Sequence, residues 1–257
     1  MTIHPTAIIS DNAHIDPTAK IGAYCIIGDD VSIGAGCVLM SHVVIRKNTK
    51  IGQNNKIYQF ASIGEDCQDL KYAGEETWLE IGDNNLIREA CSFHRGTVQD
   101  GGVTKIGSHN LFMVNTHIAH DCVVGNHNIL ANNVGVAGHV RIGDYVVIGG
   151  NAGIHQFCHV AHYAMSAAAS LIIKDVMAFT TVSGNPAKVR GLNIEGMRRK
   201  SWSSHTISQL RQAYQWVFRS GLTTDQAIAK LKPMVADEPK IQLMIDSLTN
   251  SRRGIVR

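Results

Sequence analysis

The hydrophobic residues of this chain recur every six positions over most of its length. An apolar side chain stands at each sixth position of residues 9–63, and the same period returns over 81–93 and 106–172, interrupted only by Ser166. An α-helix would repeat every 3.6 residues and a simple strand every two, so neither explains the pattern. Three hexads fit one triangular coil of 18 residues, and successive coils stack as parallel strands about 4.8 Å apart. The period therefore predicts a parallel β-helix, an all-β solenoid of hexapeptide repeats in which each coil buries its apolar residues against its neighbours.

Two interruptions and one end bound this repeat. The period breaks at 69–80 and at 99–105, where we expect loops inserted into the coils. After about residue 186 the period disappears and apolar residues follow helical spacing instead. We therefore predict a β-helix domain over 1–186 and an α-helical C-terminal domain over 187–257.

Composition and charge agree with a soluble solenoid. The chain has 6% aromatic and 18% charged residues and 24 glycines, which suits a narrow core of small aliphatic side chains. Its formal net charge of +3 argues against a dedicated nucleic-acid binder, and no apolar run is long enough to span a membrane. The N-terminal sequence lacks the basic and apolar regions of a signal peptide, so we expect a cytoplasmic protein.

The cysteines share one position of the repeat. Counted from the aliphatic residue of each hexad, all six stand at the fifth place: Cys25, Cys37, Cys67, Cys91, Cys122 and Cys158. Scattered metal ligands or disulfide partners would not share a single phase. We therefore interpret the cysteines as small buried residues of a protein in a reducing compartment.

Nine of the 13 histidines lie between positions 94 and 162, and the coil length predicts which of them meet. Residues one coil apart stack directly, so His120 is followed in its column by Gly138. The columns on either side contain His139 and His155, which places three histidines on one edge within about 10 Å. A glycine in such a cluster would let a ligand approach its backbone N–H. This edge is the candidate polar site.

Two alternatives stay open from the residues alone. The spacing of His117 and His120 could supply two zinc ligands, as in hexapeptide solenoids of the gamma-class carbonic anhydrase type, which bind zinc with three histidines. The inserted loops could be surface decoration or the walls of a substrate site.

Five stretches resemble one known family, the UDP-N-acetylglucosamine 3-O-acyltransferases, which depend on acyl carrier protein and open lipid A synthesis. The resemblance spans essentially the whole chain and rests on Gln68-Asp-Leu-Lys-Tyr-Ala-Gly74, His94-Arg-Gly96, Asn115-Thr-His-Ile-Ala-His-Asp-Cys122, Ile154-His-Gln-Phe-Cys158, and Asn193-Ile-Glu-Gly196 followed by Arg198-Arg199. It implies a left-handed coil and a homotrimer with sites between subunits. It also implies transfer of a 3-hydroxyacyl group from acyl carrier protein to UDP-N-acetylglucosamine, with no cofactor or metal beyond the acyl-carrier-protein co-substrate.

The resemblance also implies a role for individual residues. His120 matches the general base that deprotonates the sugar 3-hydroxyl for direct attack on the thioester, and a neutral imidazole suits that task. Asp121 would orient or stabilise the ring, and the Gly138 N–H would donate to the oxyanion. Substrate-binding positions are implied for Gln68, Asp69, Lys71, His94, His117, His139, His155, Gln156, Asn193, Glu195 and Arg199.

One position departs from the family pattern. Ala168 stands where long-chain members have glycine, and we expect the extra methyl group to shorten the preferred acyl chain. A basic group in the tail would suit an acidic carrier protein and consists of Arg198, Arg199, Lys200 and Arg211. Two further enzyme hypotheses compete with O-acyl transfer: an N-acyltransferase on a UDP-amino-sugar of the same pathway, which usually has an extra N-terminal domain, and a zinc hydratase.

Overall fold

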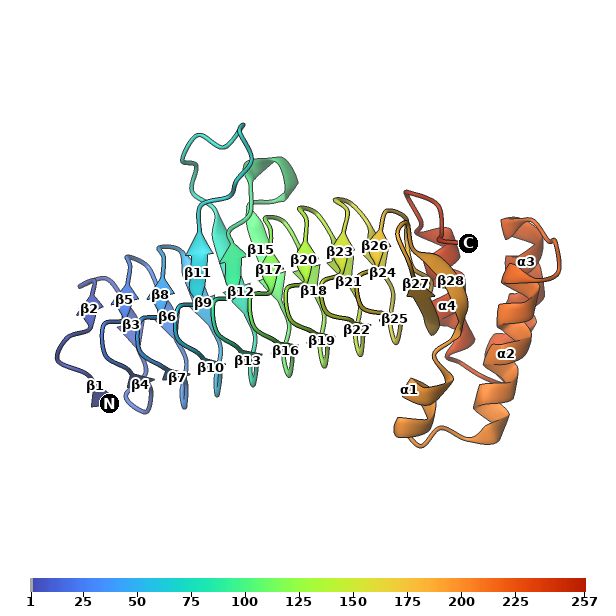
Figure 1. The fold of residues 1–257 in the computed structure, drawn as a ribbon, viewed down its shortest axis with the longest axis horizontal. Helices are drawn as coiled ribbons and strands as arrows, with labels where there is room; N and C mark the ends of the chain where they lie inside the picture. Colours follow the sequence, from blue (N-terminus) through green and yellow to red (C-terminus); the bar gives the residue numbers. More distant parts are fainter. Residues whose placement is uncertain (1) are drawn as a thin grey trace.

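The computed structural model describes residues 2–257, which wind into a three-sided parallel β-helix with helices at its C-terminal end (Figure 1). Each coil contributes one short strand to each of three sheets. Sheet A contains β1 (Thr2–Ile3), β4 (Lys20–Ile21), β7 (Val38–Leu39), β10 (Lys56–Ile57), β13 (Leu86–Ile87), β16 (Leu111–Phe112), β19 (Ile129–Leu130), β22 (Val147–Ile148), β25 (Met165–Ser166), β27 (Thr180–Ser183) and β28 (Lys188–Leu192).

The other two sheets complete the prism. Sheet B contains β2 (Ile8–Ile9), β5 (Ile26–Ile27), β8 (Val44–Ile45), β11 (Ser62–Glu65), β14 (Ser92–His94), β17 (His117–Ile118), β20 (Gly135–Val136), β23 (Gly153–Ile154) and β26 (Leu171–Ile172). Sheet C contains β3 (His14–Ile15), β6 (Ser32–Ile33), β9 (Thr49–Ile51), β12 (Trp78–Ile81), β15 (Val103–Ile106), β18 (Val123–Val124), β21 (Arg141–Ile142) and β24 (His159–Val160).

The six-residue period and the core coincide. In uninterrupted coils each strand pairs in parallel with the strand one coil later, as Leu130 does with Ile148. The apolar residue of each hexad points into the prism, and both of these side chains are completely buried. All six cysteines are free and buried, as their common phase predicts. The solenoid core is therefore a stack of aliphatic layers that each neighbouring coil completes.

Close stacking explains the frequent Ile-Gly pairs. A Cβ atom built on Gly107 would lie 2.5 Å from the carbonyl oxygen of Gly125 in the next coil, well inside van der Waals contact. The corners use a different device, since residues such as Asp121 (φ 59°) and His139 (φ 61°) adopt the left-handed backbone conformation. These corners turn the chain from one sheet to the next and carry side chains outward.

The two inserted loops lie on the same side of the β-helix (Figure 1). Lys56 pairs with Leu86, and Leu86 pairs with Leu111; both steps are longer than an uninterrupted coil, so each insertion lengthens one coil. The expected bounds need correction: residues 78–80 and 103–105 belong to β12 and β15, because they pair with each other in register across sheet C. The loops between strands are 66–77 and 95–102, and the second contains a 3-10 turn at Val98–Asp100.

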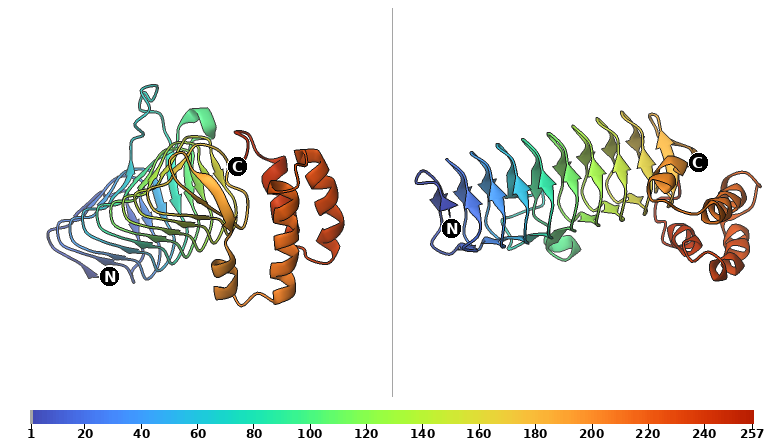
Figure 2. Two further views of the ribbon diagram at one scale, coloured as in Figure 1. Left: turned by 45° about the vertical axis from the view of Figure 1, so that its right-hand side comes forward. Right: turned by 90° about the horizontal axis from the view of Figure 1, so that it is seen from below.

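The C-terminal part begins with a strand rather than a helix. β28 turns back antiparallel on β27, so the first residues of the expected helical domain extend sheet A. The helices follow as α1 (Ile194–Arg199), α2 (Ser204–Phe218), α3 (Thr224–Leu231), the 3-10 segment η2 (Lys232–Ala236) and α4 (Ile241–Thr249). Figure 2 shows them gathered at the end of the β-helix opposite the N-terminus. Within residues 2–257 no helix combines the length and apolarity needed to cross a membrane.

Candidate active site

The predicted column of His120 and Gly138 is present at the corner between sheets B and C. The His139 N–H donates to the His120 carbonyl (3.0 Å), and the Phe157 N–H donates to the Gly138 carbonyl (3.1 Å), so three successive coils stack in register. A Cβ on Gly138 would lie 2.6 Å from His120 Cε1 and 2.7 Å from Nε2. The imidazole therefore occupies the space that any side chain at position 138 would need.

A buried carboxylate holds the His120 ring. The Nδ1 atom of His120 lies 2.8 Å from Oδ2 of Asp121, whose side chain has no exposed surface. Thr97 donates to the same carboxylate twice, from its backbone N–H (2.7 Å) and its hydroxyl (2.6 Å). Burial acts to raise the pKa of Asp121, but the hydrogen bonds from His120 and Thr97 outweigh it and the pKa is lowered. An ionised acceptor at Nδ1 requires the hydrogen there, which leaves the Nε2 lone pair of the neutral ring free.

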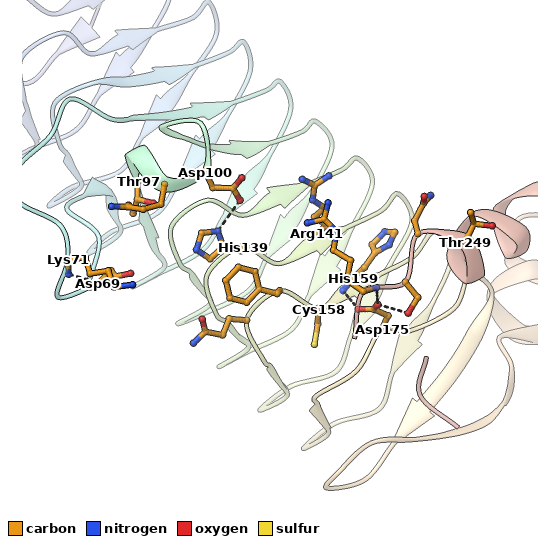
Figure 3. A pocket seen from close by; sticks show the side chains of 16 residues that line it. Asp69, Lys71, Thr97, Asp100, His139, Arg141, Cys158, His159, Asp175 and Thr249 are labelled. Carbon is orange, nitrogen blue, oxygen red and sulfur yellow. Dashed lines mark hydrogen bonds and ion pairs between the residues drawn. The ribbon is translucent and has the colours of Figure 1, made fainter. Parts of the chain in front are cut away.

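His139 forms a second imidazole–carboxylate pair beside the first. Its Nδ1 atom lies 2.9 Å from Oδ2 of Asp100 and 3.8 Å from Oδ2 of Asp121. The ring stands at 89° to that of His120, with 5.0 Å between centroids, and stacks on Phe157 at 4.4 Å. Figure 3 shows His139 facing Asp100 across the corner.

A cleft of about 790 Å³ lies on the sheet B side of this corner. It brings together most of the expected residues, namely Gln68, Asp69, Lys71, His117, His120, Gly138, His155 and Gln156. Gln68, Asp69 and Lys71 come from loop 66–77, and the rest come from the corner and sheet B. This loop is therefore one wall of the cleft.

The floor of the cleft contains two glycines that were not among the expected site residues. Gly135 and Gly153 occupy outward positions of β20 and β23, in one row with His117 and Leu171. Nothing lies within 4 Å of a Cβ built on Gly135. Other hexads carry a larger residue just before the inward aliphatic, so the pairs Gly135-Val136 and Gly153-Ile154 were a visible signal of a groove.

A second cleft of about 1060 Å³ lies on the sheet C side of the corner (Figure 3). His139, Arg141 and His159 line it, together with residues 249–252 of the C-terminal segment. Asp69 and Lys71 line both clefts. The first loop therefore reaches over the corner and faces both sides of it.

Besides the buried residues Asp121 and His94, four expected site residues line neither cleft of this chain. Asn193 caps α1, where its Oδ1 accepts from the Gly196 N–H (3.0 Å), and Glu195 pairs with Arg199 (3.2 Å) on the same exposed helix. Ala168 lies on an exposed corner after β25. These positions follow the later coils, so the chain's own fold keeps them apart from His120.

His94 is also outside both clefts, because its side chain is buried in the β-helix. It is 5% exposed, and its ring packs edge-on against His117 at 4.8 Å. Burial, and then the neighbouring His117, lower the pKa of His94 to about 4. The pKa of His117 is also lowered by burial.

We expect this buried histidine to make the folded state sensitive to acid. In the unfolded chain His94 takes up a proton as pH falls through 6.5, whereas in the folded chain it does so only near pH 4. The free energy of unfolding should therefore fall between these pH values, by about 3 kcal/mol in total from this residue. Thermal unfolding followed by circular dichroism at pH 7 and pH 5 should show a smaller drop in Tm for His94→Gln. Equal drops in both proteins would contradict the expectation.

One group of side chains within residues 2–257 has the donor set of a metal site. Ligand atoms of His120, Asp121 and His139 lie within 4.8 Å of one another. His117, half of the proposed zinc pair, is not in the group, and its Nδ1 atom lies 2.8 Å from the Ser92 hydroxyl. In the group itself both Nδ1 atoms already face carboxylates, so the arrangement is that of two hydrogen-bonded pairs.

Comparison with known proteins gives a consistent result. The family model described as "Udp N-acetylglucosamine O-acyltransferase; Domain 2" matches residues 175–256, and that of the bacterial transferase hexapeptide matches 6–41 and 104–138. A relative from Psychrobacter sp. (strain PRwf-1), named acyl-[acyl-carrier-protein]–UDP-N-acetylglucosamine O-acyltransferase, is 68% identical over 99% of each chain.

Solved structures extend this likeness to the whole fold. UDP-N-acetylglucosamine O-acyltransferase from Moraxella catarrhalis superposes with a TM-score of 0.99 at 64% identity, with full coverage of both chains. LpxA from Acinetobacter baumannii gives 0.98 at 65%, also with full coverage. The likeness confirms the left-handed parallel β-helix of hexapeptide repeats with a helical C-terminal part.

Proposed function

Because this chain belongs to the acyl-[acyl-carrier-protein]–UDP-N-acetylglucosamine O-acyltransferases, we propose that it transfers a 3-hydroxyacyl group from acyl carrier protein to the 3-hydroxyl of UDP-N-acetylglucosamine, the first step of lipid A biosynthesis. The chain is an acyltransferase. The observation that carries the finer proposal is the His120–Asp121 pair against Gly138 at the edge of an open cleft.

The chemistry follows from these three residues. Nε2 of His120 takes the proton of the sugar 3-hydroxyl as its oxygen attacks the thioester carbonyl carbon. Within the described chain the Gly138 N–H has no hydrogen-bond acceptor, so it is free to donate to the oxyanion that forms. When the intermediate collapses, the C–S bond breaks and the carrier thiolate takes the proton back from His120. Asp121 stabilises the imidazolium between the two transfers, and no covalent acyl-enzyme is needed.

The cleft offers separate regions for the two substrates. Asp69 and Lys71 have the charges and donors that suit a nucleotide sugar beside His120. The floor over Gly135 and Gly153, leading to Leu171, suits an extended acyl chain, because it is apolar and lacks side chains.

The proposal includes a homotrimer with sites between subunits. Sheet A carries a row of outward apolar side chains that are only partly covered in one chain: Leu86, Leu111, Ile129, Val147 and Met165. Packing this row against sheet B of a neighbour would bury it. The neighbour would then add Asn193, Glu195 and Arg199 to the site, which the single chain leaves apart from His120.

Two further features support the proposed partner and location. The exposed basic side chains of Arg198, Arg199, Lys200 and Arg211 form a surface that suits an acidic carrier protein. Six free, buried thiols suit the reducing conditions of the cytoplasm.

The test is transfer itself. Purified protein is incubated with 3-hydroxyacyl carrier protein and either UDP-N-acetylglucosamine or a UDP-sugar with a free 2-amino group, and products are identified by mass spectrometry. An ester product with the first acceptor supports the proposal. Product only with the amino-sugar would establish the N-acyltransferase alternative, and stoichiometric zinc with neither product would favour a hydratase.

Ala168 carries a separate prediction about the donor. Within this chain it lies outside the cleft, three residues before Leu171 on the coil that ends the apolar floor, and the resemblance is the reason to expect its methyl group to limit the acyl chain. With a ladder of 3-hydroxyacyl donors, we expect Ala168→Gly to shift the preferred length upward, since removing one methyl group makes room for about one more methylene, which contributes about 0.8 kcal/mol when buried. An unchanged preference would remove Ala168 from this role.

A further inference from the structure

The second inserted loop, residues 95–102, contacts three parts of the site that are distant in sequence. Arg95, Thr97 and Asp100 each direct a side chain to a different partner. Arg95 and Thr97 are 1% and 2% exposed, so their partners are protein groups rather than water.

Thr97 determines where the Asp121 carboxylate sits. Its N–H binds Oδ1 and its hydroxyl binds Oδ2, the oxygen that also receives the His120 Nδ1–H. A single residue thereby binds both carboxylate oxygens. From the other side, the backbone N–H of Asp121 donates to the Thr104 hydroxyl (2.8 Å) in the strand that follows the loop. Thr97 therefore orients His120 indirectly, because it holds the Asp121 carboxylate that binds the ring.

Arg95 holds the other inserted loop, which carries Asp69 and Lys71. Its guanidinium donates to the Gly64 carbonyl, to the Asp66 carboxylate and to the Tyr72 hydroxyl, the last at 3.1 Å. These acceptors lie before and within loop 66–77, on both sides of Asp69. A planar guanidinium satisfies several fixed acceptors at once, which a lysine cannot do.

Asp100 makes the third contact, to His139 at 2.9 Å. It follows Thr97 by one 3-10 turn, so the same short segment reaches both imidazole–carboxylate pairs. Figure 3 shows Thr97 and Asp100 on this segment, with Asp69 and Lys71 of the first loop nearby.

We propose that loop 95–102 is the positioning element of the active site. Thr97 sets the orientation of the base through Asp121, and Arg95 sets the place of the substrate loop. Thr97 lines the second cleft, but neither residue lines the cleft beside His120, so toward that cleft both act through the residues they bind. The inference rests on the proposed acyl transfer, and it assigns the two residues different kinetic signatures.

Thr97→Val tests the first contact, because it keeps the shape and removes the hydroxyl. We expect kcat to fall about 10-fold with KM for both substrates unchanged, since only the orientation of the base is lost. Without the hydroxyl, Asp121 is a stronger acceptor and favours the protonated His120 ring, so the acidic limb of the kcat/KM profile should move to higher pH. Thr97→Ser, which keeps the hydroxyl, should restore both.

Arg95→Lys tests the second contact. We expect KM for UDP-N-acetylglucosamine to rise about 10-fold with kcat within twofold of the wild type. The variant weakens the contacts that hold loop 66–77, whereas His120 keeps its orientation. Tyr72→Phe is the milder variant, since it removes one of the acceptors of Arg95, and it should change KM in the same direction. Val98→Ala, at an exposed position of the same loop, is the matched control and should change neither parameter.

The outcomes separate this inference from the proposed function. Failure of the wild type to form product would overturn the function. Wild-type activity together with unchanged kcat and pH profile in folded Thr97→Val would overturn the inference alone. If Thr97→Val does not fold, Thr97→Ala is tested in its place. The folded fraction of each protein is measured by circular dichroism. A rise in KM for Thr97→Val, or a fall in kcat for Arg95→Lys, would also contradict the assignment.

Discussion

Replacing His120 with alanine is expected to lower kcat about 10³-fold, the scale of a lost general base. One nitrogen of this ring is held by a buried carboxylate, and the other is free at the edge of the cleft. Its removal leaves the sugar hydroxyl without an acceptor for its proton. Steady-state transfer from 3-hydroxyacyl carrier protein to UDP-N-acetylglucosamine, under saturating substrates, measures the loss.

A matched histidine variant separates this effect from damage to the fold. His14→Ala removes an exposed imidazole from sheet C near the N-terminus and should leave kcat unchanged. Both variants should unfold at nearly the temperature of the wild type, because His120 is a corner side chain rather than part of the core. If His120→Ala keeps more than a tenth of the wild-type kcat, the residue is not the base.

Gly138→Ala is expected to lower kcat about 10²-fold or more, on the scale of a lost oxyanion donor. The new Cβ would fall 2.6 Å from His120 Cε1, so either the ring rotates away from Asp121 or the backbone that carries the Gly138 N–H shifts. Both movements separate the base from the oxyanion donor. Gly191→Ala is the control, since nothing lies within 4 Å of a Cβ at that position.

Combining His120→Ala with Gly138→Ala tests whether the loss of kcat in Gly138→Ala arises from the clash with the His120 ring. With His120 already replaced by alanine the clash disappears, so adding Gly138→Ala should cost much less than it does in the wild type. Full additivity of the two losses would contradict a route through the imidazole. It would leave displacement of the oxyanion donor as the cause.

The stacking of the site could be predicted because the coil is periodic. His120 and Gly138 are separated by one full coil, and the repeat places any such pair in contact, as the backbone hydrogen bond from His139 to His120 shows. The same counting predicted that the cysteines are buried, because all six share one position of the repeat. Even the groove floor could have been inferred, from the glycines that precede Val136 and Ile154.

The loops did not follow such arithmetic. Their positions were visible as breaks in the period, but their ends were placed too late in the chain, because strand pairing resumes before the hydrophobic phase is evident. Asn193 and Ala168, expected in the site by resemblance, stand away from His120 within one chain. A single sequence contains no information on where a neighbouring subunit would place them.

The coil, its core, its corners and the columns that stack on them all followed from the order of the amino acids. In a solenoid, backbone hydrogen bonds join residues at a constant separation along the chain. Counting residues is therefore sufficient to predict which positions stack on one another. How the loops complete the site became visible only in three dimensions, with Thr97 on Asp121 across 24 residues and Arg95 on the Gly64 carbonyl across 31. Those contacts depend on side-chain geometry that no repeat encodes, so counting along the chain could not place them.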